Sequence, residues 1–352
     1  MRITAKTTKI IDKENELMSY TTRCPYFPLV VDSANGIHVT DIEGNRFIDM
    51  MASAAVMNTG HNHEKIVDAI HRQVDKFIHY TPAYMYHEPH TFLAEKLVEL
   101  VPGDFEKRVS FGLSGSSSVD GALKAVKAYT KRNHIISFFR SYHGTTYGAL
   151  SVSGYGAEMK RRVGILMPDV HFIPYPDSYR GCTEDQCIER LEELFDTIVP
   201  PEDVAAIIYE PIQGDAGILI PENKFYKRLQ KIAKENGILM IADEVQTGFA
   251  RTGKMFASEW FDVVPDMMVV GKAIASGMPL SAIIGRKEIM EAWSTPVHFF
   301  NTAGNVLSCT AALATIDVVQ QEKLVENSYR IVFPLVGMHQ KYSSKSFSFS
   351  LY

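Results

Sequence analysis

Polar residues follow several apolar runs of this sequence, at the points where buried strands would end. Asp243 follows ILMIA, Lys272 follows MMVVG and Glu210 follows VAAIIY. A fourth run, RVSFGL, leads into the small-residue segment Ser114–Ser118, and a fifth, IISFF, ends shortly before the Tyr-His-Gly tripeptide at 142–144. Open parallel sheets bind ligands outside the carboxyl ends of their strands. We therefore expect the five segments to meet in one crevice.

An acid and a lysine at strand ends, with a small-residue loop that opens a helix, suit pyridoxal phosphate. This cofactor needs a lysine for a Schiff base and an acid at its pyridinium nitrogen. A helix N-terminus supplies free N–H groups for its phosphate. Phosphotransferases and aldolases also place Asp and Lys at strand ends, so the residues alone leave those classes open. The sequence has no GxxxxGK[ST] and no GxGxxG after a strand, which disfavours nucleoside triphosphates and dinucleotides.

Each of these residues also has a plain structural interpretation. The serines at 114–118 suit an ordinary helix N-cap, and Asp243 suits a solvated strand end. A lysine is usually a surface residue, but the apolar sequence on both sides of Lys272 favours a buried amine with a lowered pKa. Tyr142 and His143 suit a packed aromatic ring and a histidine satisfied by hydrogen bonds.

These residues require a scaffold in which strands and helices alternate. Apolar runs that predict strands lie at residues 108–113, 135–139, 170–175, 204–210, 238–244, 266–272 and 281–286. Helical stretches are predicted at residues 116–132, 183–199 and 221–237. Strands that are almost continuously Val and Ile argue for a mostly parallel sheet with helices on both faces. The predicted fold class is therefore α/β.

The two ends of the chain are expected to differ from this core. The first fifty residues predict a helix and then short antiparallel strands, because Gly/Asn turn signals interrupt LVVDSANGIHVTDIEGNRFIDM. We assign residues 1–55 to a small domain and residues 56–315 to a large domain. A helix is predicted from about residue 312. The remainder, 316–352, is read as this connecting helix and an aberrant segment, since YSSKSFSFSLY has no helical or strand pattern.

Composition excludes several functional classes. The chain has 352 residues, is 46% hydrophobic, and carries 36 Lys and Arg against 41 Asp and Glu, for a net charge of −5. A nucleic-acid binder is usually basic, and no apolar run approaches a membrane span. The polar N-terminus does not resemble a secretory signal. Four scattered cysteines predict neither a disulfide framework nor a metal site. The expected location is the cytoplasm.

The motifs taken together resemble the class III aminotransferases, fold-type I enzymes that depend on pyridoxal phosphate. The resemblance extends from about residue 10 to about residue 330. It is carried by SGSSSVDGALKAVKAYT, YHGTTYGALSVSG, YEPIQGDAG, ADEVQTGFARTGKM, VGKAIASGMPLSA and NTAGNVLSC, in the family's order and spacing.

The resemblance implies a role for each site residue. Lys272 would form the Schiff base with pyridoxal 5'-phosphate, and Asp243 would keep the pyridinium nitrogen protonated. The other implied contacts are Gly115 and Ser116 to the phosphate, Tyr142 stacked on the ring with His143 beside it, Val245 on the opposite face, Gln246 at the 3-hydroxyl, and Glu210 as a structural or gating acid.

Two positions bear on the reaction. The 4-aminobutyrate transaminases carry Arg directly after His-Gly, where this chain has Thr145, and they tend to have Glu where it has Asp215. An Asp there resembles the branch of amino-acid racemases and isoleucine 2-epimerases. The resemblance implies an external aldimine and a quinonoid, with Lys272 serving one face of Cα and Asp215 the other. The favoured substrates are branched-chain amino acids. A transaminase of the 4-aminobutyrate or omega-amino acid type is the alternative.

Some positions depart from the family pattern. Ser117 and Ser118 replace an acidic residue and Ala, and Ala250 replaces a Gly. The Thr that would bind the phosphate of the neighbouring subunit aligns with Asn301, with Thr302 one place later. Because that contact crosses a subunit boundary in the family, the resemblance implies a homodimer with shared active sites.

The C-terminal end is the largest departure, because family members continue into a further α/β subdomain. A frameshift or an early stop is the simplest hypothesis, and a genuine short variant that uses another chain is the rival. We expect the truncated chain to be weakly stable and to have little or no catalytic activity. A catalytically impaired remnant is therefore a further alternative to an active enzyme.

Overall fold

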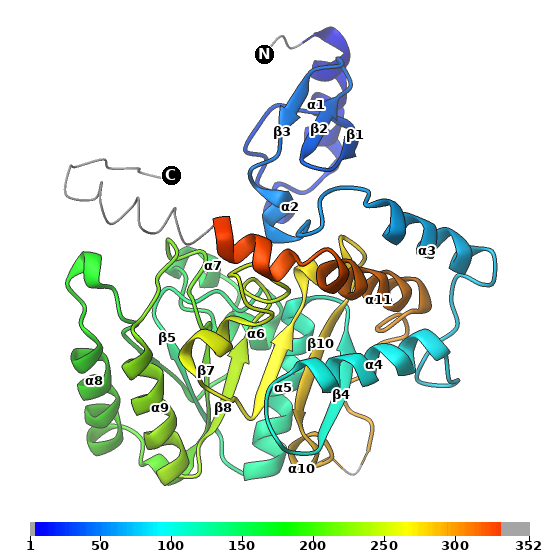
Figure 1. Ribbon diagram of the computed structural model, residues 1–352. Helices are drawn as coiled ribbons and strands as arrows, with labels where there is room; N and C mark the ends of the chain where they lie inside the picture. Colours follow the sequence, from blue (N-terminus) through cyan, green and yellow to red (C-terminus); the bar gives the residue numbers. More distant parts are fainter. Residues whose placement is uncertain (1–3, 294, 332–352) are drawn as a thin grey trace.

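The structure is a computed structural model that describes residues 4–293 and 295–331. The expected aberrant segment falls largely on residues 332–352, which lie outside the described residues. The chain forms a seven-stranded sheet flanked by helices and a small three-stranded sheet near its N-terminus (Figure 1).

The large sheet is mostly parallel, as the sequence predicts. Its strands are β4 (Lys107–Gly112), β5 (His134–Phe138), β6 (Val170–Ile173), β7 (Val204–Tyr209), β8 (Leu239–Asp243), β9 (Met267–Val270) and β10 (Ser281–Arg286). They lie in the order β4-β10-β9-β8-β7-β5-β6. Strand β10 runs antiparallel to both of its neighbours, β4 and β9, whereas the other paired strands are parallel.

Helices cover both faces of this sheet (Figure 1). They are α3 (Glu64–Val74), α4 (Glu88–Leu100), α5 (Gly115–Thr130), α6 (Tyr147–Val152), α7 (Ala157–Lys160), α8 (Glu184–Thr197), α9 (Asn223–Glu235), α10 (Lys287–Met290) and α11 (Val306–Gln321). Neighbouring strand residues point to opposite faces. Ile135 packs with residues of α5, and Ile136 packs with residues of α8 and α9. Both faces of the strand are therefore buried, which explains its unbroken apolar run.

The N-terminal part has the predicted helix and antiparallel strands. Helix α1 (Ala5–Leu17) precedes β1 (Val31–Asn35), β2 (His38–Asp41) and β3 (Arg46–Ile48). These strands form their own sheet, which stands apart from the large one in Figure 1. The proposed domain boundaries at residues 55 and 315 stay a prediction.

A left-handed turn joins this small sheet to the rest of the chain. All four residues of α2 (Ala52–Ala55) have positive φ, from 48° at Ala52 to 63° at Ala55. Side chains with a Cβ are disfavoured there by roughly 1–2 kcal/mol per residue. The turn leads directly into Val56, which lines the cavity described below.

The predicted helix from residue 312 differs from the structure in its bounds. Helix α11 begins at Val306, because the side chain of Asn305 accepts a hydrogen bond from Ser308 N at 3.0 Å and caps it. It ends at Gln321, and Lys323 adopts a positive φ of 54°. The chain is helical again from residue 324 to residue 331. The asparagine cap signal at 305 was available in the sequence.

Candidate active site

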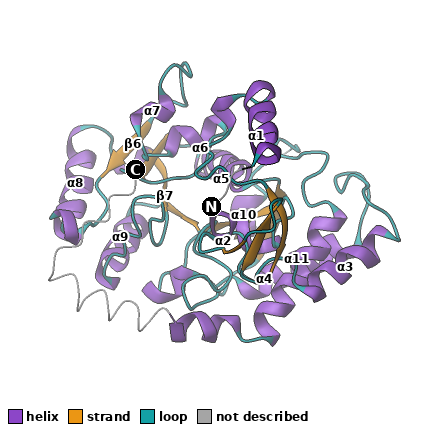
Figure 2. Ribbon diagram, turned by 90° about the horizontal axis from the view of Figure 1, so that it is seen from above, coloured by secondary structure: helices purple, strands orange, loops and turns teal. Residues whose placement is uncertain are grey.

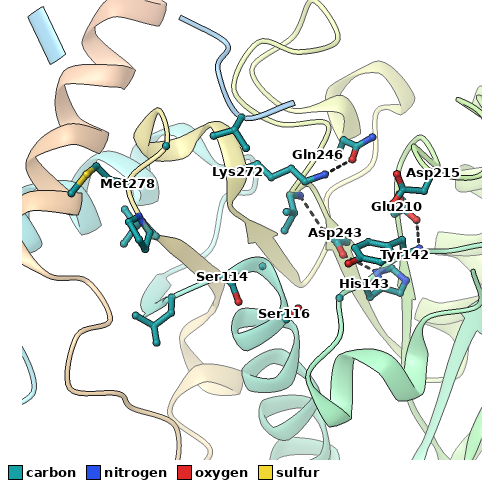
Figure 3. Close-up of a pocket in the computed structure, with 18 residues that line it drawn as sticks. Ser114, Ser116, Tyr142, His143, Glu210, Asp215, Asp243, Gln246, Lys272 and Met278 are labelled. Atoms are coloured by element: carbon teal, nitrogen blue, oxygen red, sulfur yellow. Dashed lines mark hydrogen bonds and ion pairs between the residues drawn. The ribbon is translucent and has the colours of Figure 1, made fainter. Parts of the chain in front are cut away.

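A cavity of about 320 Å³ opens at the carboxyl ends of the parallel strands. Its walls come from the loops after β4, β5, β7, β8 and β9, the five segments expected to converge (Figure 3). Ten of the predicted site residues line it: Gly115, Ser116, Tyr142, His143, Glu210, Asp215, Asp243, Val245, Gln246 and Lys272. The strand-end rule therefore located this cavity correctly.

The segment Ser114–Ser118, here called the serine loop, both caps α5 and faces the cavity. Ser114 is the N-cap of α5, and Ser117 completes a capping box with it. Ser117 therefore occupies the N3 position of the capping box, where Glu or Gln is more usual. Ser116 accepts a hydrogen bond from Thr145 N at 3.0 Å. The first turn of a helix leaves its N–H groups without intrahelical partners, so an anion in the cavity finds donors here.

A strand from the far end of the sequence fixes this loop. Ser281 of β10 donates to Ser114 O at 2.6 Å and shares a second hydrogen bond with Ser118 at 2.7 Å. A Cβ at Gly115 would lie 2.9 Å from Val245. The loop therefore packs without spare room against the segment that follows β8.

Asp243 and His143 form a buried pair in the wall of the cavity. His143 Nδ1 and Asp243 Oδ2 lie 2.7 Å apart, and the side chains are 0% and 4% exposed. The other carboxylate oxygen accepts from Val245 N at 3.1 Å. Nε2 of His143 is buried and has no hydrogen-bond partner among the described residues. The carboxylate is thus held in one orientation at the end of β8.

Lys272 begins the 3₁₀ turn that follows β9. Its φ is 44°, so the backbone is strained, as is common where a side chain is aimed at a site. Nζ donates to Gln246 Oε1 (Figure 3). Burial lowers the pKa of Lys272, and the carboxylates of Asp215, Asp243 and Glu210 oppose that shift. A buried amine with a lowered pKa is a better nucleophile than a surface lysine.

Glu210 joins two loops of the site. One oxygen accepts from Tyr142 N at 2.8 Å and the other from Gly214 N at 3.1 Å. Burial raises the pKa of Glu210 to about 7, and the charge of Asp243 adds to the shift. This carboxyl therefore positions the backbone at Tyr142 and the loop that carries Asp215.

Asp215 lies at the exposed rim of the cavity. Its loop is closed by backbone pairing of Gln213 with Leu219. Burial first, and then the charge of Asp215, raise the pKa of Tyr142. The same carboxylate is the strongest influence that raises the pKa of Lys272. Asp215 therefore acts electrostatically on residues from two other loops.

Two predicted residues do not join this cavity. Asn301 and Thr302 are exposed and do not line it. Conversely, an apolar wall made by Val56, Leu113, Met278, Pro279 and Leu280 was not singled out from the sequence. Residues 277–280 (GMPL) lie inside the motif VGKAIASGMPLSA, so the sequence could have indicated their contribution to this wall. Nothing near Val56 in the sequence indicates that it reaches a site so distant along the chain.

The cavity fits pyridoxal phosphate on three independent observations. The small-residue loop at the start of α5 offers N–H donors for a phosphate, and Asp243 offers a fixed carboxylate for a ring nitrogen. The buried amine of Lys272 lies in the same cavity. Comparison with known proteins agrees: the family model for Aminotransferase class-III matches residues 20–346.

The chain belongs to the class III aminotransferase family. Isoleucine 2-epimerase from Lentilactobacillus buchneri is 46% identical over 331 residues, which cover 92% of this chain and 74% of that protein. Leucine/methionine racemase from Thermococcus litoralis is 41% identical over 330 residues, with the same coverage of 92% and 74%. Both matches agree with the predicted racemase and epimerase branch.

A solved structure of the family shows the same fold. Taurine:2-oxoglutarate aminotransferase from Bifidobacterium kashiwanohense, in complex with PLP and glutamate, has a TM-score of 0.87 and 31% identity. The match covers 97% of this chain and 80% of that one. The predicted fold type I and the predicted cofactor are confirmed. No helix among the described residues is long and apolar enough to cross a membrane.

Proposed function

We propose that this class III aminotransferase-family enzyme is an amino-acid racemase or epimerase that acts on branched-chain and other apolar amino acids. One observation carries the proposal: the Lys272 amine and the Asp215 carboxylate line one cavity but come from different loops (Figure 3). Inversion at Cα needs a proton removed on one face and returned on the other. The similarity to an isoleucine 2-epimerase and a leucine/methionine racemase supports it.

The cofactor would be held by residues already placed around the cavity. We assign Asp243 to the pyridinium nitrogen, Gly115 and Ser116 to the phosphate, and Tyr142 to one ring face, with Val245 on the other. His143 orients Asp243, and Gln246 holds Lys272 Nζ beside the 3-hydroxyl position. When bound, the cofactor supplies a cationic conjugated ring that stabilises negative charge developing at the substrate Cα.

Lys272 and Asp215 would share the proton transfers. Lys272 would be the residue that forms the Schiff base with the cofactor, and its amine Nζ would remove or return the substrate Cα proton on its own face. The Asp215 carboxyl performs the matching transfer on the opposite face. A transaminase would need no second group of this kind, because Lys272 alone moves the proton.

The walls of the cavity favour an apolar substrate side chain. Val56, Leu113, Met278 and Leu280 contribute hydrocarbon surface, and Thr145 offers no positive charge for a distal carboxylate. Burial of a branched aliphatic side chain on such a wall contributes roughly 1.5–3 kcal/mol. An omega-amino acid with a distal carboxylate gains no ion pair at Thr145.

A homodimer with shared sites accounts for the two residues outside the cavity. Asn301 and Thr302 would bind the cofactor phosphate of a second copy. Exposed large apolar side chains include Phe299 at 50%, two residues before Asn301, and Ile78 at 62%, Tyr84 at 68% and Tyr86 at 101% in the segment before α4. Where such side chains form one patch, they mark a protein interface.

We also keep the cytoplasm as the proposed location, supported by four cysteines that are all free thiols.

A time course distinguishes racemisation from transamination. L-isoleucine or L-valine is incubated with the enzyme, a catalytic amount of cofactor and no keto acid. We expect loss of optical activity without keto acid release. In deuterated water, the newly formed enantiomer should carry deuterium at Cα while the remaining substrate carries little, since two separate groups serve the two faces. Lys272→Ala is the matched control and should be inactive.

Consumption that depends on stoichiometric 2-oxoglutarate or pyruvate would instead establish transamination. Absence of any turnover, with the cofactor still bound, would identify the impaired form considered from the sequence.

A further inference from the structure

Two thiols touch at the edge of the large sheet, far from the cofactor residues. Sγ of Cys182 and Sγ of Cys187 lie 3.5 Å apart. Cys182 precedes α8, and Cys187 lies within it. Helix α8 lies beside β6 in Figure 2. A disulfide needs a sulfur–sulfur distance of about 2.05 Å, so a small side-chain adjustment is enough to join them.

Both cysteines are fixed by local structure. Cys182 exchanges two backbone hydrogen bonds with Asp177, each of 2.9 Å. Cys187 lies in the first turn of α8, where its N–H donates to the N-cap Thr183 O at 3.2 Å. A preformed contact between two anchored thiols gives each a high effective concentration at the other.

The surroundings assign different parts to the two sulfurs. Cys182 is partly exposed and lines a cavity of about 370 Å³ together with Arg140 and Arg180. Both guanidinium groups are half-exposed and pair at 2.8 Å with Asp177, which lines the same cavity. The thiolate is the reactive form of cysteine, and Cys182 is the sulfur of this pair that solvent reaches.

Cys187 is the protected partner. Its side chain is 0% exposed. Burial raises the pKa of its thiol, and the hydrogen bond it shares with Cys182 and the nearby Glu184 carboxylate raise it further. A small oxidant therefore reaches Cys182 first, and Cys187 reacts only through its contact with Cys182.

We propose that Cys182 and Cys187 form an oxidative modification site, a reversible disulfide made by exchange with a small disulfide such as oxidised glutathione. The Cys182 thiolate attacks one sulfur of the small disulfide, and a mixed disulfide forms as one thiolate leaves. The Cys187 sulfur then attacks Cys182 Sγ and displaces the second thiolate. The two cysteines lose two electrons and two protons, and the small disulfide becomes two thiols.

The modification has a structural consequence for the neighbouring loop. The cavity lined by Cys182 also contains Gln213, whose Nε2 donates to Phe139 O at 3.1 Å. Gln213 pairs with Leu219 to close the loop that carries Asp215. The disulfide would fix one wall against which this loop lies.

Peptide mass spectrometry tests the site directly. Trypsin cleaves after Arg180 and Arg190, so both cysteines fall in one peptide, 181–190. The reduced full-length chain, carrying Cys24→Ser to remove the exposed thiol, is treated with oxidised glutathione, alkylated and digested. We expect this peptide to be unalkylated and about 2 Da lighter than the dithiol form, and dithiothreitol should restore it. Cys309, which is buried and has a pKa raised to about 12, is the internal control and should stay reduced.

Two variants separate the roles. Cys187→Ala should accumulate a glutathione adduct on Cys182, whereas Cys182→Ser should leave Cys187 as a free thiol. A doubly alkylated 181–190 peptide from the folded chain, under conditions where the same chain oxidises in urea, would overturn the proposal. That wild-type comparison does not depend on either variant folding. Equal glutathione adducts on Cys182→Ser and Cys187→Ala would overturn the assigned order of attack.

Discussion

Glu210 is a buried carboxyl whose pKa lies close to neutral pH. Its pKa is raised to about 7 in the folded chain, against a reference of 4.5. The folded state therefore holds this proton more tightly than the unfolded state does. The contribution to stability is complete below about pH 4.5 and is lost as the pH rises to about 7, with an upper limit of about 3 kcal/mol.

Glu210→Gln should remove this pH dependence. The amide cannot ionise, although it loses one of the two acceptor positions for Tyr142 N and Gly214 N at every pH. Urea unfolding of the cofactor-free chain at pH 5 and pH 8 gives the measurement. The variant should lose less stability between the two pH values than the wild type. Equal losses would assign the titration to another group.

Asp215 provides a second test at the residue scale. Asp215→Asn keeps the size of the side chain but removes its proton-transfer capacity. We expect racemisation to fall by about 10²–10⁴-fold, the usual contribution of a positioned acid or base. The Lys272 face remains intact, so exchange of the substrate Cα proton with deuterated water should persist without inversion. Loss of exchange and racemisation to the same extent would show that Asp215 acts on binding rather than on the second proton.

At the scale of elements, the left-handed turn at Ala52–Ala55 is strained by its side chains. Ala54 has a φ of 61° and is exposed, so a glycine there loses few contacts. Ala54→Gly should stabilise the chain by about 1 kcal/mol. Ala69→Gly, within α3, is the matched control and should destabilise it by about 1 kcal/mol. Thermal unfolding of both variants measures these changes in stability. A change of the same sign in both variants would contradict the assignment of strain to the turn.

The sequence predicts the strands and the strand-end residues well, because both depend on local pattern. Apolar runs identify β7 and β10, and the residue after a buried strand identifies Asp243 and Lys272. The reversed direction of β10 has no local signal, since it is set by pairing with β4 and β9.

Other features depend on contacts between distant segments. Val56 reaches the cavity only because the strained turn directs the chain there. The spacing of apolar residues predicts one continuous helix here, whereas the positive φ of Lys323 divides it into two helical stretches. A role that needs a second copy of the chain cannot be tested in one copy, and the role proposed for Asn301 and Thr302 is of this kind.

At the scale of the whole molecule, subunit mixing tests the shared sites. Lys272→Ala removes the amine of its own site, and a chain with Asn301→Ala and Thr302→Ala lacks the contacts offered to its partner. A hybrid dimer contains one site with every wild-type residue. Random mixing of the two inactive variants should restore about a quarter of wild-type activity. Sedimentation of the wild type should show a dimer. A mixture no more active than its parents would place Asn301 and Thr302 outside the partner's site.

The Ser281 hydrogen bonds to the serine loop set an order for biosynthesis. Strand β4 and its loop emerge from the ribosome early, but β10, their partner, is the last strand of the sheet to be made. Pairing between segments so far apart in sequence is slow to form. The anion-binding loop thus reaches its final shape only after nearly the whole sheet has been translated. Cofactor capture on nascent chains would therefore report completion of the sheet, and chains released before β10 should fail to retain it.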